Sequence, residues 1–117
     1  TKLEKVISYT KQTMVAYMSE EDFNRLCAYI VEYSSGDTLQ KISPVKVDSQ
    51  LKSVDIMHFG WNIGKAFSKK RIHTATFIKN VFAHALRNLE ISTIERKMSH
   101  TESECRIKLN GEIGSII

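Results

Sequence analysis

Apolar side chains recur every three or four positions through much of the chain, which is the period of an amphipathic helix. Residues 2–18 carry one such stripe, and a second begins after Ser19. Serine suits a helix N-cap, and the carboxylates of residues 20–22 suit the positive end of the helix dipole. Gly36 suits the position that ends the second helix. The pattern therefore predicts an antiparallel helical hairpin over residues 1–36.

A polar stretch over residues 37–50 holds the only proline, Pro44, and is expected to be a linker because proline interrupts a helix. The apolar period resumes over about 48–67, which predicts a third helix and the most buried element. Gly60 and Gly64 lower helix stability relative to alanine. At these two positions we therefore expect either a close approach by a neighbouring helix or a bend.

The last third of the chain predicts two more helices followed by a β-hairpin. Thr74 could cap a helix over residues 75–87. Ser92, with Glu95 three positions later, has the pattern of a capping box for a short helix. Beyond that helix, apolar and polar residues alternate on both sides of Asn110-Gly111, which is typical of a two-residue hairpin turn.

We therefore expect a mainly α fold, with about five helices and a C-terminal β-hairpin whose strands are residues 105–109 and 112–116. Residues 1–48 would form the helical hairpin and its linker, and residues 49–117 a second unit. The pattern leaves open whether the first unit packs on the same core as the second.

Charge is distributed unevenly along the chain, whose net charge is +4. Residues 1–48 hold six Lys/Arg and seven Asp/Glu, whereas residues 49–117 hold eleven Lys/Arg and six Asp/Glu. The second segment therefore carries the positive field. A basic surface of this kind attracts anionic partners and contributes phosphate contacts that do not depend on sequence.

The order helix, helix, short turn, helix and hairpin over residues 49–117 resembles a winged helix-turn-helix domain. The segments Val54-Asp55-Ile56 and Ile94-Glu95-Arg96-Lys97-Met98 also resemble the RteC family of excision regulators of conjugative transposons. The resemblance implies a regulator of transcription or of a mobile element that binds double-stranded DNA through its last helix and a basic wing. The expected DNA-binding residues are Lys69, Lys70, Arg71, Ser92, Thr93, Arg96, Lys97, Arg106 and Lys108.

A second hypothesis is a non-enzymatic protein-interaction or assembly module. A two-helix hairpin has one apolar seam to bury internally, and exposed tyrosines, which are favoured at interfaces, would support a homodimer through residues 1–36. The same periodicity fits helices that pack onto the rest of their own chain. The tyrosines concerned are Tyr9, Tyr17, Tyr29 and Tyr33.

Catalytic and metal chemistry find little support in the residue pattern. Without a phosphate-binding glycine loop, a nucleophile motif or H-E-x-x-H, we expect no enzyme, no cofactor and no metal. The histidines occur singly, and His58, on the apolar third helix, is expected to be a structural imidazole. Cys27 and Cys105 lie far apart, which favours reduced thiols and a cytoplasmic protein. No apolar run approaches the roughly 20 residues of a membrane span.

Overall fold

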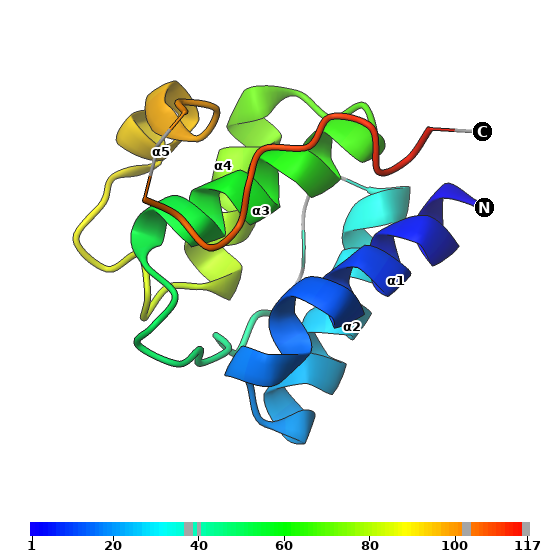
Figure 1. Ribbon diagram of the computed structural model, residues 1–117, viewed down its shortest axis with the longest axis horizontal. Helices are drawn as coiled ribbons and strands as arrows, with labels where there is room; N and C mark the ends of the chain where they lie inside the picture. Colours follow the sequence, from blue (N-terminus) through cyan, green and yellow to red (C-terminus); the bar gives the residue numbers. More distant parts are fainter. Residues whose placement is uncertain (37–38, 40, 102–103, 116–117) are drawn as a thin grey trace.

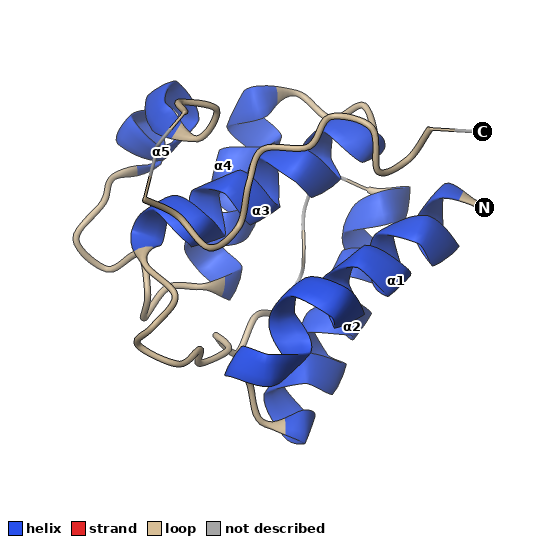
Figure 2. Ribbon diagram, in the orientation of Figure 1, coloured by secondary structure: helices blue, strands red, loops and turns tan. Residues whose placement is uncertain are grey.

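The computed structural model describes residues 1–36, 39, 41–101 and 104–115 (Figure 1). Within these residues the chain is mainly helical, and Figure 2 shows loops and turns but no strand between the helices. A short 3₁₀ turn, η1, continues from the first helix. The elements are α1 (Lys2–Met14), η1 (Val15–Tyr17), α2 (Glu20–Ser35), α3 (Ser53–Ala66), α4 (Arg71–Val81) and α5 (Ile91–Lys97).

The first two helices form a hairpin, and the turn between them ends at the predicted N-cap residue, Ser19. The Ser19 hydroxyl accepts a hydrogen bond from the backbone N–H of Asp22 at 3.1 Å, and α2 starts there. The two helices contact each other and lie side by side in Figure 1. Val6 and Met14 of α1 and Leu26 of α2 are fully buried, so the apolar stripes face the core as their spacing predicted.

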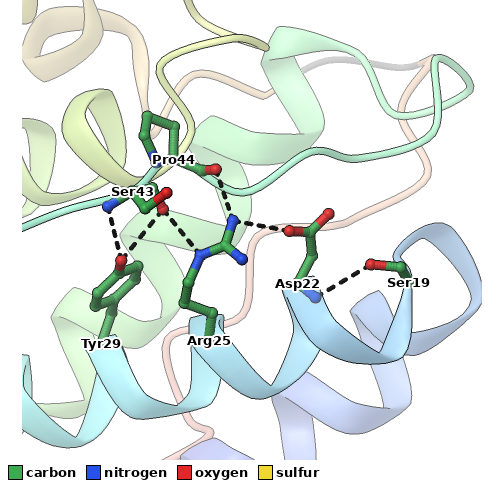
Figure 3. A network of polar contacts seen from close by, with 6 residues as sticks. All are labelled: Ser19, Asp22, Arg25, Tyr29, Ser43 and Pro44. Atoms are coloured by element: carbon green, nitrogen blue, oxygen red, sulfur yellow. Dashed lines mark hydrogen bonds and ion pairs between the residues drawn. The ribbon is translucent and has the colours of Figure 1, made fainter.

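Helix α2 also holds the polar linker, as Figure 3 shows. The Arg25 guanidinium donates to the carbonyl oxygens of Ser43 and Pro44 at 3.0 and 2.8 Å. It also pairs with Asp22 at 2.8 Å. The Tyr29 hydroxyl accepts from the N–H of Ser43 at 2.8 Å. These contacts satisfy linker backbone groups that have no partner in a helix or a sheet.

The most buried element is α3, as predicted, with ten of its fourteen residues buried. Tyr9 of α1 stacks on Phe59 of α3 with ring centroids 5.8 Å apart. Tyr33 of α2 stacks on Phe77 of α4 with centroids 4.1 Å apart. The buried apolar residues of all five helices belong to one cluster. The helical hairpin and the later helices therefore share a hydrophobic core.

Two glycines allow α4 to lie close against α3. A Cβ atom added at Gly60 would come 2.6 Å from the Ile78 side chain. One added at Gly64 would come 2.3 Å from the Thr74 hydroxyl oxygen. Both distances are shorter than van der Waals contact, so larger residues would require α4 to shift. Close approach is therefore the role that these glycines play.

The starts of α3 and α4 differ from the predicted starts because side chains make other contacts. Asp55 accepts a hydrogen bond from the Lys52 N–H at 2.9 Å, so α3 begins at Ser53 and not near residue 48. Thr74 does not cap α4, which begins three residues earlier. Its hydroxyl lies 2.7 Å from that of Tyr33, inside the core.

The connection between α4 and α5 is longer than the predicted tight turn. Helix α4 ends at Val81, and residues 82–90 connect it to α5. Leu86 is fully buried in this connection, and the Lys79 ammonium donates to the Leu86 carbonyl at 2.8 Å. These contacts hold the connection against the core. Helix α5 begins at Ile91 without a side-chain cap, so the expected capping box does not form.

The predicted C-terminal β-hairpin is wrong. Residues 104–115, named the strap here, contain no strand and run along α3 as a single irregular chain, orange to red in Figure 1. No described glycine has a positive φ, so Gly111 does not form the turn that the hairpin needs. The winged-helix-like fold class is therefore contradicted, although the chain is mainly α. Residue 116, the last of the expected second strand, lies outside the described residues.

Three α3 side chains take the place of the missing second strand. Asp55, His58 and Asn62 are spaced by three and four residues, so they share one helix face. Asp55 Oδ1 accepts from the two N–H groups of residues 106–107 at 2.6 and 3.0 Å. Asn62 donates to the backbone carbonyl of residue 108 at 2.8 Å and accepts from the backbone N–H of residue 110 at 2.7 Å. Side chains of α3 thus provide hydrogen-bond partners for backbone N–H and C=O groups of the strap.

Candidate nucleic-acid interface

No aspartate or glutamate occurs between Asp55 and Glu90, a region that carries six lysines and arginines. The fold gathers Lys65, Lys69 and Arg71 where the last turn of α3 meets the first turn of α4. They line a groove of about 340 Å³, named the basic groove here, and no carboxylate of the described residues lines it. Its other lining residues are Trp61, Gly64, Thr74, Met98 and Ser99.

Arg71 lies between α4 and α5. Its guanidinium donates to the Ser99 hydroxyl at 2.9 Å and to the backbone carbonyl of Glu95. Both partners are neutral oxygens at the C-terminal end of α5, where the helix dipole is negative. The positive charge of Arg71 therefore has a favourable environment but no carboxylate at these contacts. The same hydrogen bonds fix the end of α5 against the start of α4.

The three lysines near the groove have different surroundings. Lys69 donates to the Gly36 carbonyl at 3.1 Å, and its ammonium lies 5.2 Å from the centroid of the Tyr33 ring. Lys70 is exposed at the start of α4. Lys65, exposed on the last turn of α3, was not among the predicted contacts. The run without acidic residues is the sequence signal that could have identified it.

Helix α5 buries one face and exposes the other. Ile94 and Met98 are buried, as their spacing predicted. The helix has only seven residues, and Arg71 contacts the end that carries its two basic residues. The predicted contact residues on it are Ser92, Arg96 and Lys97, which are exposed, and Thr93, which is half-buried.

The last two predicted residues lie on the strap and not on a wing. Arg106 donates through Nε to the Gln50 carbonyl at 3.3 Å, beside the start of α3. The Arg106 N–H donates to Asp55, so Arg106 lies beside Asp55. Asp55 precedes Lys65 by ten residues, which is about 15 Å along a helix. Lys108 is exposed in the middle of the strap. The predicted residues therefore do not all converge, because Arg106 lies near the opposite end of α3.

Another cavity with basic residues, about 570 Å³ in volume, lies at the N-terminal end of α3. Lys46, Lys52 and Arg87 line it together with Asp48 and His84. Lys52 and Arg87 donate to backbone carbonyls, at 3.1 and 2.8 Å. The Asp48 carboxylate offsets one of the positive charges. The smaller basic groove has no carboxylate from residues 1–36, 39, 41–101 and 104–115 in its lining, and is therefore the better candidate for an anionic ligand.

His58 is a structural imidazole, as expected. Its Nδ1 lies 2.7 Å from the Ile107 carbonyl oxygen, and its Nε2 lies 2.7 Å from that of His100. Carbonyl oxygens only accept, so both contacts are hydrogen bonds together only when each ring nitrogen carries a proton. The ring thus joins two chain segments to α3. In the described part of the chain, no three His, Cys, Asp or Glu residues are grouped to hold a metal ion.

The tyrosines expected at a dimer interface contribute to the chain's own core. Tyr29 is 7% exposed and Tyr33 is fully buried, contrary to the expected exposure. Tyr9 is half-buried, and its hydroxyl accepts from the Asn62 amide at 2.7 Å. Burial raises the pKa of Tyr9 above its ordinary value, while hydrogen bonds with Asn62 and Thr13 oppose the rise. These tyrosines therefore give little support to a homodimer through the first hairpin.

Within residues 1–36, 39, 41–101 and 104–115, no helix is long and apolar enough to cross a membrane. Comparisons with protein-family models, curated proteins and solved structures gave no match to this chain. The resemblance to winged helix-turn-helix domains and to the RteC family therefore stays a prediction. Function must be inferred from the basic groove, the helices that form it and their charges.

Proposed function

We propose that this chain is a non-enzymatic DNA-binding protein and that the basic groove contacts the phosphate backbone of double-stranded DNA. The observation that carries the proposal is the convergence of Lys65, Lys69 and Arg71 on one groove that, within the described part of the chain, no carboxylate lines. Cations arranged in this way bind DNA because each phosphate contact releases condensed counterions. Such binding requires no particular base sequence.

The N-terminal end of α4 adds to the positive potential of the groove. The helix begins at Arg71, has no acidic residue in its first turn and has no side-chain cap. The positive end of the helix dipole is therefore not offset by a carboxylate from its own first turn. Backbone N–H groups at such an end favour a phosphate oxygen. This contribution reinforces the lysines and does not replace them.

Helix α5 is the second element of the proposed interface. Its end is fixed by Arg71, and Ser92, Arg96 and Lys97 are exposed on it. Contacts with phosphates position a protein on DNA, whereas contacts with base edges give specificity. We assign positioning to the basic groove and leave base contacts to α5. Arg106 has no part in the interface, because it lies beside Gln50.

Affinity for DNA is expected to fall steeply as salt rises. With three phosphate contacts at about −0.9 each, the log–log slope of affinity against salt should be about −2.7. Lys65→Ala should lower affinity at low salt and make the slope shallower by about one unit, because it removes one contact. Fluorescence anisotropy with a labelled mixed-sequence duplex, repeated over a salt series, measures both quantities.

Lys11→Ala is the matched control for this substitution. Lys11 is also an exposed lysine in the last turn of a helix, but that helix is α1, which Figure 1 shows well away from α5. Its replacement should leave the affinity and the salt slope unchanged. Absence of binding at low salt would contradict the proposal. Equal losses in the two variants would contradict the assignment to the basic groove.

A further inference from the structure

Trp61 is the only tryptophan of the chain, and its side chain lines the basic groove. It is half-buried, whereas both its neighbours, Gly60 and Asn62, are buried. The strap covers one edge of the indole, since a Cβ added at Gly111 would lie 3.4 Å from its Cη2 atom. Among the described residues, Trp61 stacks on no other aromatic ring. The indole packs in part against the core and contributes partly exposed aromatic surface to the groove.

We propose that Trp61 stacks on an unpaired DNA base while Lys65 and Arg71 hold the adjoining phosphates. This inference rests on the proposed function and adds the kind of DNA that the groove takes, namely a duplex with at least one unpaired nucleotide. The volume of about 340 Å³ falls within the range of small-ligand pockets, roughly 300–1,000 Å³. The groove is therefore of a size for one nucleotide.

The groove combines two kinds of surface that an intact duplex does not satisfy together. Trp61 is aromatic and partly exposed, whereas Lys65, Lys69 and Arg71 are cationic. A paired duplex presents its phosphates but keeps its bases stacked inside, so it engages only the cations. An unpaired nucleotide presents a phosphate and a planar base together. Stacking of that base on an indole is tolerant of sequence, because every base has a π-face.

The full chain carries its own reporter for this contact, because Trp61 is its single tryptophan. A duplex with one unpaired thymine should quench the tryptophan emission and bind about tenfold more tightly than the fully paired duplex. The paired duplex should bind without comparable quenching. A third duplex, with an abasic nucleotide at the unpaired position, should behave like the paired one. This third DNA separates stacking of the base from flexibility of the backbone.

Two variants test the same contact by affinity. Trp61→Ala should remove the roughly tenfold preference, so that it binds the paired duplex and the duplex with the unpaired thymine alike, whereas Trp61→Phe should keep part of the preference because a ring remains. Circular dichroism checks whether each variant folds. If Trp61→Ala does not fold, the quenching of tryptophan emission in the unaltered chain tests the stacking contact. Equal affinity and unchanged emission with all three DNAs would overturn this inference alone. Absence of binding to all three would contradict the proposed function itself.

Discussion

Asp55→Ala is expected to lower the free energy of unfolding by about 4 kcal/mol, because three backbone N–H groups lose their acceptor. Asp55 is 1% exposed, and its carboxylate accepts from the N–H groups of Lys52, Arg106 and Ile107. Each buried donor left unsatisfied costs about 1 to 3 kcal/mol. The substitution should also loosen the strap where it meets the start of α3. Urea unfolding followed by circular dichroism measures the change in stability.

Asp48→Ala is the control for this experiment. Asp48 is an exposed aspartate that accepts one backbone hydrogen bond, from Gln50 at 2.8 Å. Its removal should cost about 1 kcal/mol or less. Similar losses in the two variants would contradict the conclusion that buried α3 side chains hold the strap in place.

Gly64→Ala is expected to cost about 2 kcal/mol, even though alanine is the better helix former by about 1 kcal/mol. The new methyl group would lie 2.3 Å from the Thr74 hydroxyl oxygen. Thr74 has little freedom to move, because its hydroxyl is hydrogen-bonded to that of Tyr33 at 2.7 Å. Helix α4 must therefore shift away from α3 and lose packing. The midpoint of urea unfolding should fall accordingly.

Gly36→Ala is the matched control for steric crowding. A Cβ added at Gly36 has its nearest neighbour 3.9 Å away, which is ordinary contact. Its φ is −161°, a value open to alanine, so stability should change by less than about 0.5 kcal/mol. If Gly64→Ala were as stable as the unaltered chain, the close contact between α3 and α4 would be wrong.

The helices of the first hairpin could be predicted because their signals are local. Apolar periodicity and the Ser19 cap depend on residues close in the sequence, and α1 and α2 lie where those signals indicated. The start of α4 was wrong for a different reason. Thr74 is a suitable cap residue, but its hydroxyl bonds to Tyr33, 41 residues away, inside the core. A local pattern contains no information about such a partner.

The strap shows what an alternating pattern determines and what it does not. Ile107 is buried and Cys105 and Leu109 are half-buried, whereas Arg106 and Lys108 are exposed. The alternation therefore identified an extended segment with one covered face. It did not identify the partner that covers that face. Side chains of α3 make the hydrogen bonds to the strap backbone that a second strand was expected to make. Their helical spacing in the sequence does not indicate that role.

The candidate site could be predicted only in part. Lys69 and Arg71 line the basic groove and were named from the sequence as a basic run. Lys65 and Trp61 were missed because they belong to a helix whose pattern indicated the core. Arg106 was included through a wing that does not form. Clusters of basic residues can therefore be identified from the sequence. Whether their side chains converge on one groove depends on how α3, α4 and α5 pack together.

The most direct test of DNA binding at the basic groove is a two-dimensional ¹H–¹⁵N NMR titration of the labelled full chain with a mixed-sequence duplex at low salt. We expect chemical-shift changes to concentrate on the amides of residues 61–71 and 95–99. The amides of α1 should change little and serve as the internal control. Changes centred on residues 46–52 or on residues 104–107 of the strap, or no changes at all, would contradict DNA binding at this groove.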